Sequence, residues 1–364
     1  MSQLPSIRWG IVATGMISEW FVKDLILSRP DAKVHHIVQA IGSSSAAKGK
    51  TFAEKHCPES NPAIYGSYQG VYDDPNVDLV YIGTPHSFHK KNCLDAISAG
   101  KAVLCEKAFT LNARDAREVF EAAKKKNVYV AEAMWLRHRP LVHDLKKLLH
   151  EDKVIGDVLR SFSDFGIEKD IANLPATSRY KDPALGAGSL LDLGVYALTW
   201  ATIALDANNP NNAENPAILA SQTHSDNVEV ATSVILKYPA TGRQAVVTST
   251  TNVIGNPDLL TRIEGTKGSI EVTGLISSFP SGFRVYPKFV GSAVAGTLTR
   301  AEGKVYDYPV LGKGYHFEAD NTALDVLAGR LESSTMPWSE TIRMMEVMDE
   351  IRRQGGTVYG EDSA

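Results

Sequence analysis

Short, continuous apolar runs alternate with longer segments of helical periodicity between Ile7 and about Glu132, and this alternation constrains the fold most strongly. Strands buried on both faces of a sheet appear as unbroken apolar runs, and parallel strands need a crossover helix between them. The pattern predicts strands at Ile7–Ala13, Val34–Ile41, Val77–Ile82, Ala102–Cys105 and Val128–Ala131. It predicts intervening helices at Ile17–Leu27, Ala46–Lys55, His89–Ala99 and Ala113–Lys126. We therefore expect an α/β domain with a doubly wound parallel sheet at residues 1–133.

The second half of the chain follows a different pattern. It predicts a helix at Leu141–Leu149, a strand at Val158–Phe165 and, after a Gly-rich turn, a helix near Ser189–Leu205. Period-2 alternation, typical of strands with one buried face, then appears at Val228–Tyr238, Ala245–Val253, Gly268–Val272 and Arg284–Phe289. Residues 134–364 are thus expected to form an α+β domain with a large, mostly antiparallel, open-faced sheet. A homodimer through that open face is the expected assembly.

Three further segments complete this prediction. The Asn/Pro-rich stretch Asn208–Pro216 is expected to be a loop. Two helices, Phe317–Leu331 and Ser339–Arg353, are expected to close the chain, and they are free to pack back on the first domain.

Composition narrows the possible functions. Apolar residues make up 43% of the 364 residues and charged residues 22%, which is typical of a folded globular chain. The net charge of -4 offers no basic surplus for nucleic acid or an anionic membrane, and the apolar stretches fall short of the roughly 20 residues of a membrane span. Three cysteines without C-x-x-C pairing favour the cytoplasm, and His86 and His89 lack further ligands at a spacing typical of a metal site.

A strand-to-helix turn near the start of the chain predicts a phosphate site. The sequence Ala13-Thr14-Gly15-Met16-Ile17-Ser18 follows the first predicted strand and opens a helix. Free N–H groups in the first turn of such a helix bind pyrophosphate. Ala13 and Ser18 replace two glycines of the usual G-x-G-x-x-G, so a turn without a ligand remains the alternative.

The end of the second predicted strand indicates which dinucleotide is bound. An NAD enzyme carries Asp or Glu there to hold the ribose 2′-hydroxyl, whereas this chain reads Gly42-Ser43-Ser44-Ser45 and then Lys48. Hydroxyls and Lys48 suit a 2′-phosphate, which a carboxylate would repel. The segment predicts NADP, with an ordinary serine helix cap as the alternative.

Several motifs together resemble the Gfo/Idh/MocA oxidoreductase family, in particular its branch of NADP-dependent D-xylose 1-dehydrogenases and dimeric dihydrodiol dehydrogenases. The resemblance covers nearly the whole chain. It depends on Arg8-Trp9-Gly10, Tyr81-Ile-Gly83-Thr84-Pro85-His86, Cys105-Glu106-Lys107, Glu132-Ala-Met-Trp135-Leu-Arg137, Gly186 to Tyr196, and Glu332 to Ser339.

The resemblance implies a Rossmann domain and a set of site residues. It implies that Lys107 is the catalytic lysine, with Ala108 standing where the family usually has proline. The cofactor-binding residues expected from the motifs are Ala13, Thr14, Gly15, Met16, Ile17, Ser43, Ser44, Lys48, Gly83, Thr84, Pro85, His86, His89, Glu106, Lys107, Trp135 and Arg137. The expected substrate residues are Lys107, Trp135, Phe165, Asp192 and Tyr196.

Oxidation of an alcohol needs a base for the hydroxyl proton while hydride leaves for the nicotinamide. Asp192 and Tyr196 lie four residues apart and share one helix face. A tyrosine working near neutral pH needs its pKa depressed by about 2 to 3 units, which requires a cation. We therefore expect Tyr196 to act as acid/base, with Lys107 beside it to tune it and Asp192 to bind substrate or position Lys107.

The expected function is NADP-dependent oxidation of an aldose such as D-xylose at C1, or of a cyclic trans-dihydrodiol. The same residues also serve the reverse direction, so NADPH-dependent reduction of a keto-sugar or dicarbonyl, such as an osone or anhydrofructose, is an alternative. A non-catalytic NADP-binding sensor is a third possibility, disfavoured by the presence of Lys107 and Tyr196.

Overall fold

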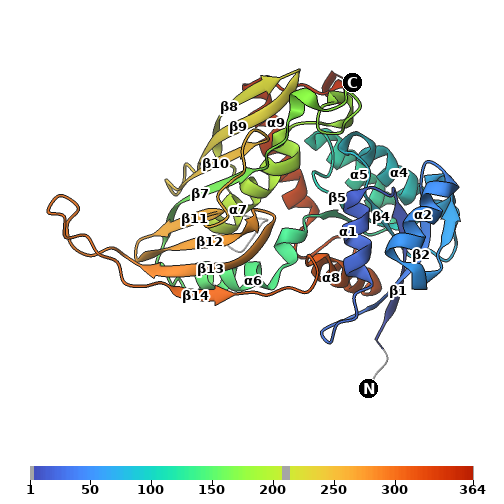
Figure 1. Cartoon of the computed structure of the whole chain (residues 1–364), viewed down its shortest axis with the longest axis horizontal. Helices are drawn as coiled ribbons and strands as arrows, with labels where there is room; N and C mark the ends of the chain where they lie inside the picture. Colours follow the sequence, from blue (N-terminus) through green and yellow to red (C-terminus); the bar gives the residue numbers. More distant parts are fainter. Residues whose placement is uncertain (1–3, 207–213, 364) are drawn as a thin grey trace. The chain divides into compact units, whose positions relative to one another are not determined.

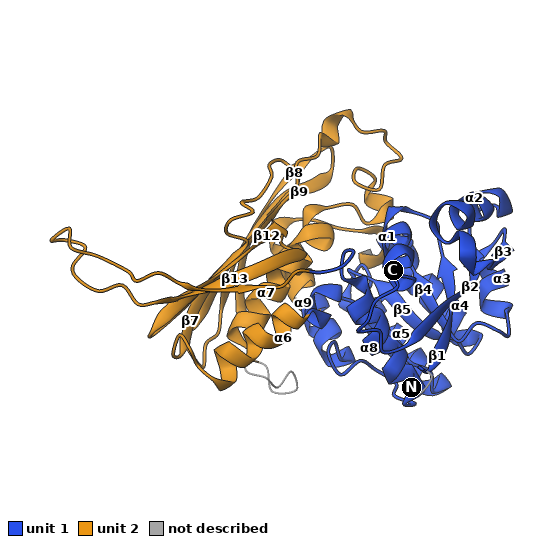
Figure 2. Ribbon diagram, turned by 60° about the horizontal axis from the view of Figure 1, so that its bottom comes forward, with its two compact units in different colours: residues 1–139, 310–345 blue, residues 140–309, 346–364 orange. Residues whose placement is uncertain are grey.

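The computed structural model describes residues 4–206 and 214–363, which form two compact units. Unit 1 contains the chain through Arg139 together with Val310–Met345, and unit 2 contains Pro140–Pro309 and the chain from Glu346 onward (Figure 2). The division expected after residue 133 differs from this, because the first unit runs six residues further and recovers a segment near the C-terminus.

Unit 1 is built on a six-stranded parallel sheet with strand order β3-β2-β1-β4-β5-β6 (Figure 1). The strands are β1 (Ser6–Val12), β2 (His35–Gly42), β3 (Ala63–Tyr65), β4 (Leu79–Ile82), β5 (Ala102–Glu106) and β6 (Val130–Ala133). The order reverses at β1, so the carboxyl ends of β1 and β4 flank the crevice where doubly wound sheets bind their ligands. The expected Rossmann architecture is confirmed.

The crossover helices follow the predicted segments closely. They are α1 (Met16–Leu25), α2 (Ala46–His56), α4 (His89–Ser98) and α5 (Ala113–Lys126). Two short elements, β3 and α3 (Tyr68–Asp73), were not predicted. They contain too few residues to display a period, and only Val71 and Tyr72 of α3 are buried.

The segment Val310–Met345 joins unit 1 through α8 (Tyr315–Leu327) and the first half of α9 (Trp338–Gly355). Asp24 on α1 accepts hydrogen bonds from the backbone N–H groups of Gly314 at 2.6 Å and Tyr315 at 2.9 Å. A carboxylate at this position satisfies orphan donors at the start of α8 and complements the helix dipole. The expectation that the final helices can return to the first domain therefore holds for α8 and for α9 up to Met345.

The outer edge of β6 is covered by this returning segment. The Val130 N–H donates to the Leu331 carbonyl at 3.0 Å, and the Trp338 indole donates to the Val130 carbonyl at 2.8 Å. A sheet edge left unpaired is a template for aggregation, so this cover protects the parallel sheet.

Unit 2 contains an eight-stranded, mostly antiparallel sheet with strand order β14-β13-β12-β11-β7-β10-β9-β8. The strands are β7 (Val158–Gly166), β8 (Ala217–Ser225), β9 (Val228–Lys237), β10 (Gln244–Thr250), β11 (Thr261–Gly265), β12 (Gly268–Ile276), β13 (Phe279–Pro287) and β14 (Lys304–Asp307). The central pair, β7 and β10, is parallel, so both strands end at the same edge of the sheet. This open-faced sheet confirms the expected class of the second domain.

One face of this sheet is covered by helices. α6 (Pro140–Lys146) leads into a π-helical turn, Lys147–Glu151, and α7 (Val195–Leu205) lies against β7 and β10. The segment Pro183–Leu205 is long and apolar enough for a membrane span, but 94% of its most apolar window is buried inside the protein, as in a core helix. Most of the loop expected at Asn208–Pro216 lies outside the described residues.

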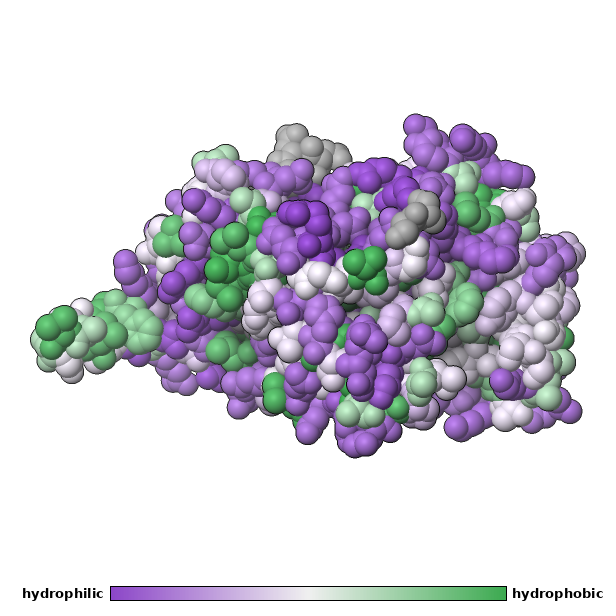
Figure 3. All heavy atoms as spheres, turned by 90° about the horizontal axis from the view of Figure 1, so that it is seen from above, coloured by the Kyte–Doolittle hydropathy of each residue, from purple (hydrophilic) through white to green (hydrophobic). Residues whose placement is uncertain are grey.

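The opposite face of the sheet is open and carries an apolar row. Leu219, Ile235 and Val246 stand directly opposite one another on β8, β9 and β10, with exposed fractions of 68%, 43% and 37%. Beyond the other edge of the sheet, the connection between β13 and β14 projects as a long arm. The arm is strongly hydrophobic at its tip (Figure 3), where Val294 is fully exposed.

Candidate active site

The turn after β1 has the geometry of a phosphate-binding turn. Ala13 adopts a positive φ of 75°, a region where glycine is more comfortable than alanine, and its N–H donates to the Gly42 carbonyl at 3.0 Å. Gly15 stands at the N-terminus of α1, and a Cβ added there would meet nothing within 4 Å. The backbone N–H groups of the first helical turn are therefore accessible to an anion.

The two replaced glycines of the fingerprint are tolerated for different reasons. Ser18 occupies the third position, which normally allows close packing of helix on strand, and it is completely buried. A Cβ on Gly83 would lie only 2.4 Å from the Ser18 hydroxyl, so the missing side chain of Gly83 makes room for Ser18. Ala13 instead accepts an unfavourable backbone conformation.

The serines after β2 have two different roles, one in capping a helix and one beside the phosphate turn. The Ser45 hydroxyl caps α2 by accepting from the Lys48 N–H at 3.3 Å, as the alternative interpretation of this segment anticipated. The Lys48 ammonium donates to the Ser44 hydroxyl at 3.1 Å, and the hydroxyls of Thr14 and Ser43 lie 3.2 Å apart. Ser43 and Thr14 therefore link the phosphate turn to this segment, while Ser44 and Lys48 are exposed beside it.

These residues fit NADP. Gly15 leaves the start of α1 open to the pyrophosphate. At the end of β2, the Ser44 hydroxyl and the Lys48 ammonium can bind a 2′-phosphate, whereas a carboxylate there would repel it. The open space at Gly15 admits the pyrophosphate, and the charge of Lys48 favours the 2′-phosphate.

Lys107 follows β5 in a turn that is held on both sides. The Lys107–Ala108 peptide is cis. The Tyr81 hydroxyl donates to the Glu106 carboxylate at 2.6 Å, and the Phe109 N–H donates to the Glu132 carboxylate at 3.2 Å. Hydrogen bonds therefore hold the turn at the position where the resembling family has proline.

His89, which is expected at the cofactor, connects two turns through its ring. Its ring is completely buried, with Nδ1 at 3.0 Å from the Ala108 carbonyl oxygen and Nε2 at 2.8 Å from the Thr84 carbonyl oxygen. Burial lowers the pKa of His89. His89 thus ties the Gly83-Thr84-Pro85 turn to the Lys107 turn, and the ring of His86 lies edge-on to it.

Two other residues expected at the cofactor are engaged elsewhere within unit 1. The Arg137 guanidinium forms an ion pair with Glu340, and only 10% of its side chain is exposed. The Trp135 ring is buried and stacks on Tyr315 with ring centroids 4.4 Å apart. These contacts give Arg137 and Trp135 structural roles that the motif alone does not reveal.

A cluster of buried carboxyl groups lies in the core of unit 1. Glu318 is completely buried, and neither of its oxygens has a hydrogen-bond partner within the described ranges. Burial, followed by the charges of Glu106 and Glu132, raises the pKa of Glu318 well above its usual range. Burial also raises the pKa of Glu132 to about 7, despite hydrogen bonds from Thr341 and Phe109. Burial therefore favours the protonated forms of Glu318 and Glu132 in this cluster.

In unit 2, the predicted substrate residues gather where the parallel strands β7 and β10 end. Phe165 near the end of β7 and Tyr196 in the first turn of α7 form an edge-on aromatic pair with centroids 5.8 Å apart. Asp192 lies one turn earlier in a π-helical segment, Leu190–Gly194, a conformation often found at functional sites. Asp192 and Tyr196 are thus carried by consecutive helical turns, as their spacing predicted.

A buried glutamate fixes the turn that carries Asp192. Glu229 on β9 accepts from the Ser189 hydroxyl at 2.5 Å, the Leu190 N–H at 2.8 Å and the Thr232 hydroxyl at 2.7 Å. A carboxylate at a helix N-terminus satisfies orphan N–H groups and complements the dipole. Burial raises the pKa of Glu229, and these hydrogen bonds oppose that effect.

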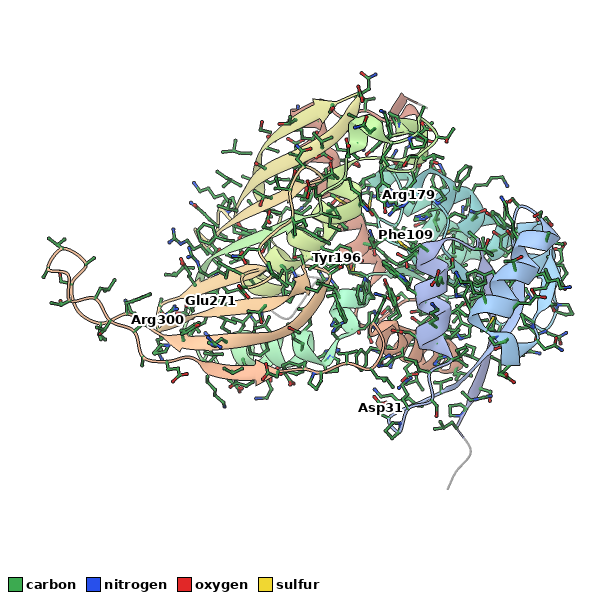
Figure 4. The ribbon with its side chains drawn as sticks, viewed as in Figure 1. Asp31, Phe109, Arg179, Tyr196, Glu271 and Arg300 are labelled. Atoms are coloured by element: carbon green, nitrogen blue, oxygen red, sulfur yellow. The ribbon has the colours of Figure 1, made fainter. Side chains whose placement is uncertain are left out.

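Sequence reasoning missed three residues of this region. Glu229 lies between Val228 and Val230 and points to the opposite face of β9, where the period-2 pattern expects a polar residue, so no signal in the sequence indicated that it is buried. Arg179 and Tyr180 lie in a polar loop, where no pattern distinguished them. Figure 4 marks Arg179 and Tyr196 in unit 2, and the Arg179 guanidinium lies 3.4 Å from the Asp192 carboxylate.

Comparisons with known proteins agree with this architecture. A model of an oxidoreductase family with an NAD-binding Rossmann fold, GFO_IDH_MocA, matches residues 7–134, and a GFO/IDH/MocA C-terminal domain model matches residues 142–271. The D-xylose 1-dehydrogenase (NADP(+)) of Hypocrea jecorina is 35% identical, covering 98% of this chain and 94% of that protein. The trans-1,2-dihydrobenzene-1,2-diol dehydrogenase of Sus scrofa is 31% identical, with 98% and 99% covered.

Solved structures share the fold. An aldose-aldose oxidoreductase from Caulobacter crescentus superposes with a TM-score of 0.76 at 23% identity, covering 96% of this chain and 98% of that one. A levoglucosan dehydrogenase superposes with a TM-score of 0.80 at 18% identity, covering 96% and 97%.

A Rossmann unit joined to an open-faced sheet unit defines a class of two-domain, dinucleotide-binding oxidoreductases. The two matched models together span more than half of the sequence. The chain belongs to the Gfo/Idh/MocA oxidoreductase family.

Proposed function

We propose that this chain is an NADP-dependent dehydrogenase that oxidises a hydroxyl-bearing carbon of an aldose, such as C1 of D-xylose, or of a cyclic trans-dihydrodiol. The observation that carries the proposal is the full-length similarity to an NADP-dependent D-xylose 1-dehydrogenase, at 35% identity. The same branch contains dihydrodiol dehydrogenases, which explains the two substrate classes. Both catalytic motifs are present on fixed turns of the fold.

Tyr196 acts as the proton acceptor for the substrate hydroxyl. NADP+, when bound, supplies the hydride acceptor. Because a phenol near its ordinary pKa is a poor base at neutral pH, the phenolate needs a cation, and Lys107, the lysine of the Glu106-Lys107 motif, is the residue proposed for that role. The edge-on contact with Phe165 fixes the orientation of the Tyr196 ring, since both rings are buried.

Asp192 accepts a hydrogen bond from a second substrate hydroxyl. Its carboxylate is 16% exposed and lies on the helical turn before Tyr196. The brace from Glu229 to Leu190 and Ser189 holds that turn, so the two groups keep a fixed separation. Fixed orientation of reacting groups lowers the entropic part of the barrier.

The cofactor is held by backbone and side chains of unit 1. The first turn of α1 binds the pyrophosphate, and Ser43, Ser44 and Lys48 bind the 2′-phosphate. Thr84 and Pro85 form the wall beside the nicotinamide, and His89 braces that turn.

Two substitutions test the mechanism. Tyr196→Phe and Lys107→Met are each expected to lower kcat by about 10²- to 10⁴-fold, because each removes proton transfer or its electrostatic support. The Kd for NADPH, measured by fluorescence titration, is expected to stay within about threefold. Lys147→Met, which removes an exposed lysine paired with Asp152, is the control. Turnover near that of the parent in either variant would remove that residue from the mechanism.

We further propose a homodimer through the open face of the unit 2 sheet. The exposed row Leu219, Ile235 and Val246 supports it, because opposed apolar side chains on one sheet face gain stability when a second copy covers them. A two-fold arrangement lets each copy present the same row to the other.

Ile235→Lys tests this assembly. The substitution places a charge in the middle of the row and is expected to convert the dimer to a monomer in sedimentation-velocity experiments. Leu327→Lys, at an exposed position on α8 in unit 1, is the control and should leave the dimer intact. A parent chain that sediments as a monomer would contradict the proposal.

We also propose a reducing compartment, the cytoplasm. Cys57, Cys93 and Cys105 are all buried as free thiols, and burial raises the pKa of Cys57 to about 11. Buried thiols with a raised pKa react slowly, and the reducing cytoplasm keeps cysteines as free thiols. Fractionation of cells that express a tagged chain tests this.

A further inference from the structure

A loop in unit 2, residues 167–189, carries a cation–aromatic cluster beside Asp192. Arg179 donates to the Tyr180 hydroxyl at 2.8 Å, and its guanidinium carbon lies 4.1 Å from the centroid of the Tyr180 ring. The Lys169 ammonium lies 4.7 Å from the same centroid. An aromatic face with cations on it and a carboxylate next to it offers both a stacking surface and a set of polar groups.

The loop holds Arg179 in a defined position. The Ser178 N–H donates to the Pro175 carbonyl at 2.9 Å, and the Asp182 N–H donates to the Ser178 carbonyl at 2.8 Å. Lys181 anchors the same turn by donating to the Ala172 carbonyl at 2.7 Å. The backbone on both sides of Arg179 is therefore fixed, which lowers the entropic cost of using its side chain for binding.

The ion pair between Arg179 and Asp192 leaves capacity for a ligand. Nη1 of Arg179 lies 3.4 Å from Oδ1 of Asp192, a loose contact, and 40% of the Arg179 side chain is exposed. A guanidinium has five N–H donors in a planar fork, and two are used in these contacts. The remaining N–H donors of Arg179 lie beside the Asp192 carboxylate, so the two side chains offer donors and acceptors next to each other.

We propose that Arg179 is a specificity-determining residue that binds hydroxyl groups of a neutral, polyhydroxylated substrate together with Asp192, and so favours aldoses over apolar ring diols. This inference rests on the proposed function, because it concerns the substrate of the same site. Adjacent hydroxyls of a sugar donate to the carboxylate and accept from the guanidinium, so both charged groups keep hydrogen bonds when water leaves.

An apolar ring would leave those charged groups poorly paired. The ring of a dihydrobenzene diol carries two hydroxyls and an apolar remainder, and covering Arg179 with that remainder costs its lost hydration. Sites built to hydrogen-bond a hydroxyl discriminate strongly against analogues that lack it.

The test compares Arg179→Met with the parent on D-xylose and on trans-1,2-dihydrobenzene-1,2-diol at saturating NADP+. The methionine keeps an apolar stem over Tyr180 and removes the donors. We expect kcat/KM for D-xylose to fall about thirtyfold, mainly through KM and with kcat within about threefold of the parent. We expect kcat/KM for the diol to change by less than about threefold. Lys147→Met, at an exposed lysine of unit 2 that pairs with Asp152, is the control and should leave both values unchanged.

The other outcomes have distinct meanings. An equal loss on both substrates, or a loss in kcat with KM retained, would overturn the specificity role while leaving the proposed function in place. A parent that prefers the diol would overturn it as well. A parent that oxidises neither compound with NADP+ would overturn the proposed function, and the role of Arg179 with it.

Discussion

Unit 1 and unit 2 build their parts of the site from different parts of the polypeptide. In unit 1 the phosphate turn is made of backbone, so Ala13 and Ser18 stand where glycines are usual and the turn keeps its form. In unit 2 the groups proposed to bind the substrate are side chains brought together from β7, a loop, a π-helical turn and α7. A backbone-built site tolerates changes of sequence, whereas a side-chain-built site depends on each residue and on its support.

The largest effect is expected where unit 1 does depend on side chains, in its buried carboxyl groups. The pKa of Glu132 is about 7 in the folded protein, above its unfolded value, so the folded state keeps a proton that the unfolded state loses. This contribution to stability is complete below about pH 4.5 and is lost as pH rises through 7. The difference corresponds to about 3 kcal/mol in the free energy of unfolding.

Urea unfolding at a series of pH values measures this contribution. Glu132→Gln keeps the shape and the contacts with Phe109 and Thr341, and it should remove the corresponding fall in stability between pH 4.5 and 7. Glu121→Gln, at an exposed position on α5, is the matched control and should keep the slope of the parent. Identical slopes in the parent and in Glu132→Gln would contradict the prediction. Glu106, Glu318, Arg137 and Glu340 also face this site, so the difference between variants is the informative quantity.

The next effect tests whether unit 2 depends on the support of its side chains. Glu229→Gln weakens two hydrogen bonds to the turn before Asp192, from Ser189 and Leu190, and hydrogen bonds to a charged group contribute about 1.5–3 kcal/mol each. We expect kcat to fall about tenfold to a hundredfold, while the Kd for NADPH stays within about twofold.

A double-mutant cycle separates this effect from general loss of stability. In an Asp192→Asn background, Glu229→Gln should have little further effect on kcat, because the carboxylate that it positions is already absent. Glu214→Gln, a substitution at a glutamate that accepts a hydrogen bond from the Ala240 N–H, is the control. Additive losses in the cycle would mean that Glu229 supports only the fold.

A smaller effect is expected at the 2′-phosphate segment. Lys48→Met removes one charge-assisted contact, and we expect KM for NADP+ to rise about tenfold with KM for NAD+ unchanged. Lys50→Met, two residues further along α2, removes a lysine near Glu54 and should leave both values unchanged. Equal changes for the two dinucleotides would show that Lys48 does not recognise the phosphate.

The smallest effect concerns the backbone itself. Ala13→Gly relieves a positive φ of 75° and is expected to raise the free energy of unfolding by about 0.5–1 kcal/mol, as measured by thermal or urea unfolding. Ala47→Gly, the same chemical change in the first turn of α2, should lower it by a similar amount because its backbone is helical. If both changes lower stability alike, the conformation of Ala13 carries no cost.

Sequence reasoning succeeded where neighbours in the chain determine the structure. The helix expected at Ala113–Lys126 has those bounds in the structure, since Asn112 caps it by accepting from the Asp115 N–H and Asn127 ends it in a left-handed conformation. The phosphate turn and the Lys107 turn are each made of consecutive residues, and they directly follow the carboxyl ends of β1 and β5.

It failed where the partner is distant in the sequence. β11 and β14 have five and four residues, too few to show alternation, and β8 was not recognised at all. The ion pair of Arg137 with Glu340, which lies 203 positions away, was not indicated by any local pattern. The support of Glu229 for the turn before Asp192 depends in the same way on a fold that places β9 beneath that turn.

The cover on β6 has a consequence for how such proteins recombine. The nucleotide-binding half is not a contiguous module, since the cover of its last strand comes from Leu331 and Trp338, on the far side of the whole second unit in the gene. In a chimera that exchanges only the first 139 residues, β6 would come from one protein and the segment that covers it from the other. A chimera should therefore exchange residues 1–139 and Val310–Met345 together and keep the residues of unit 2 between them.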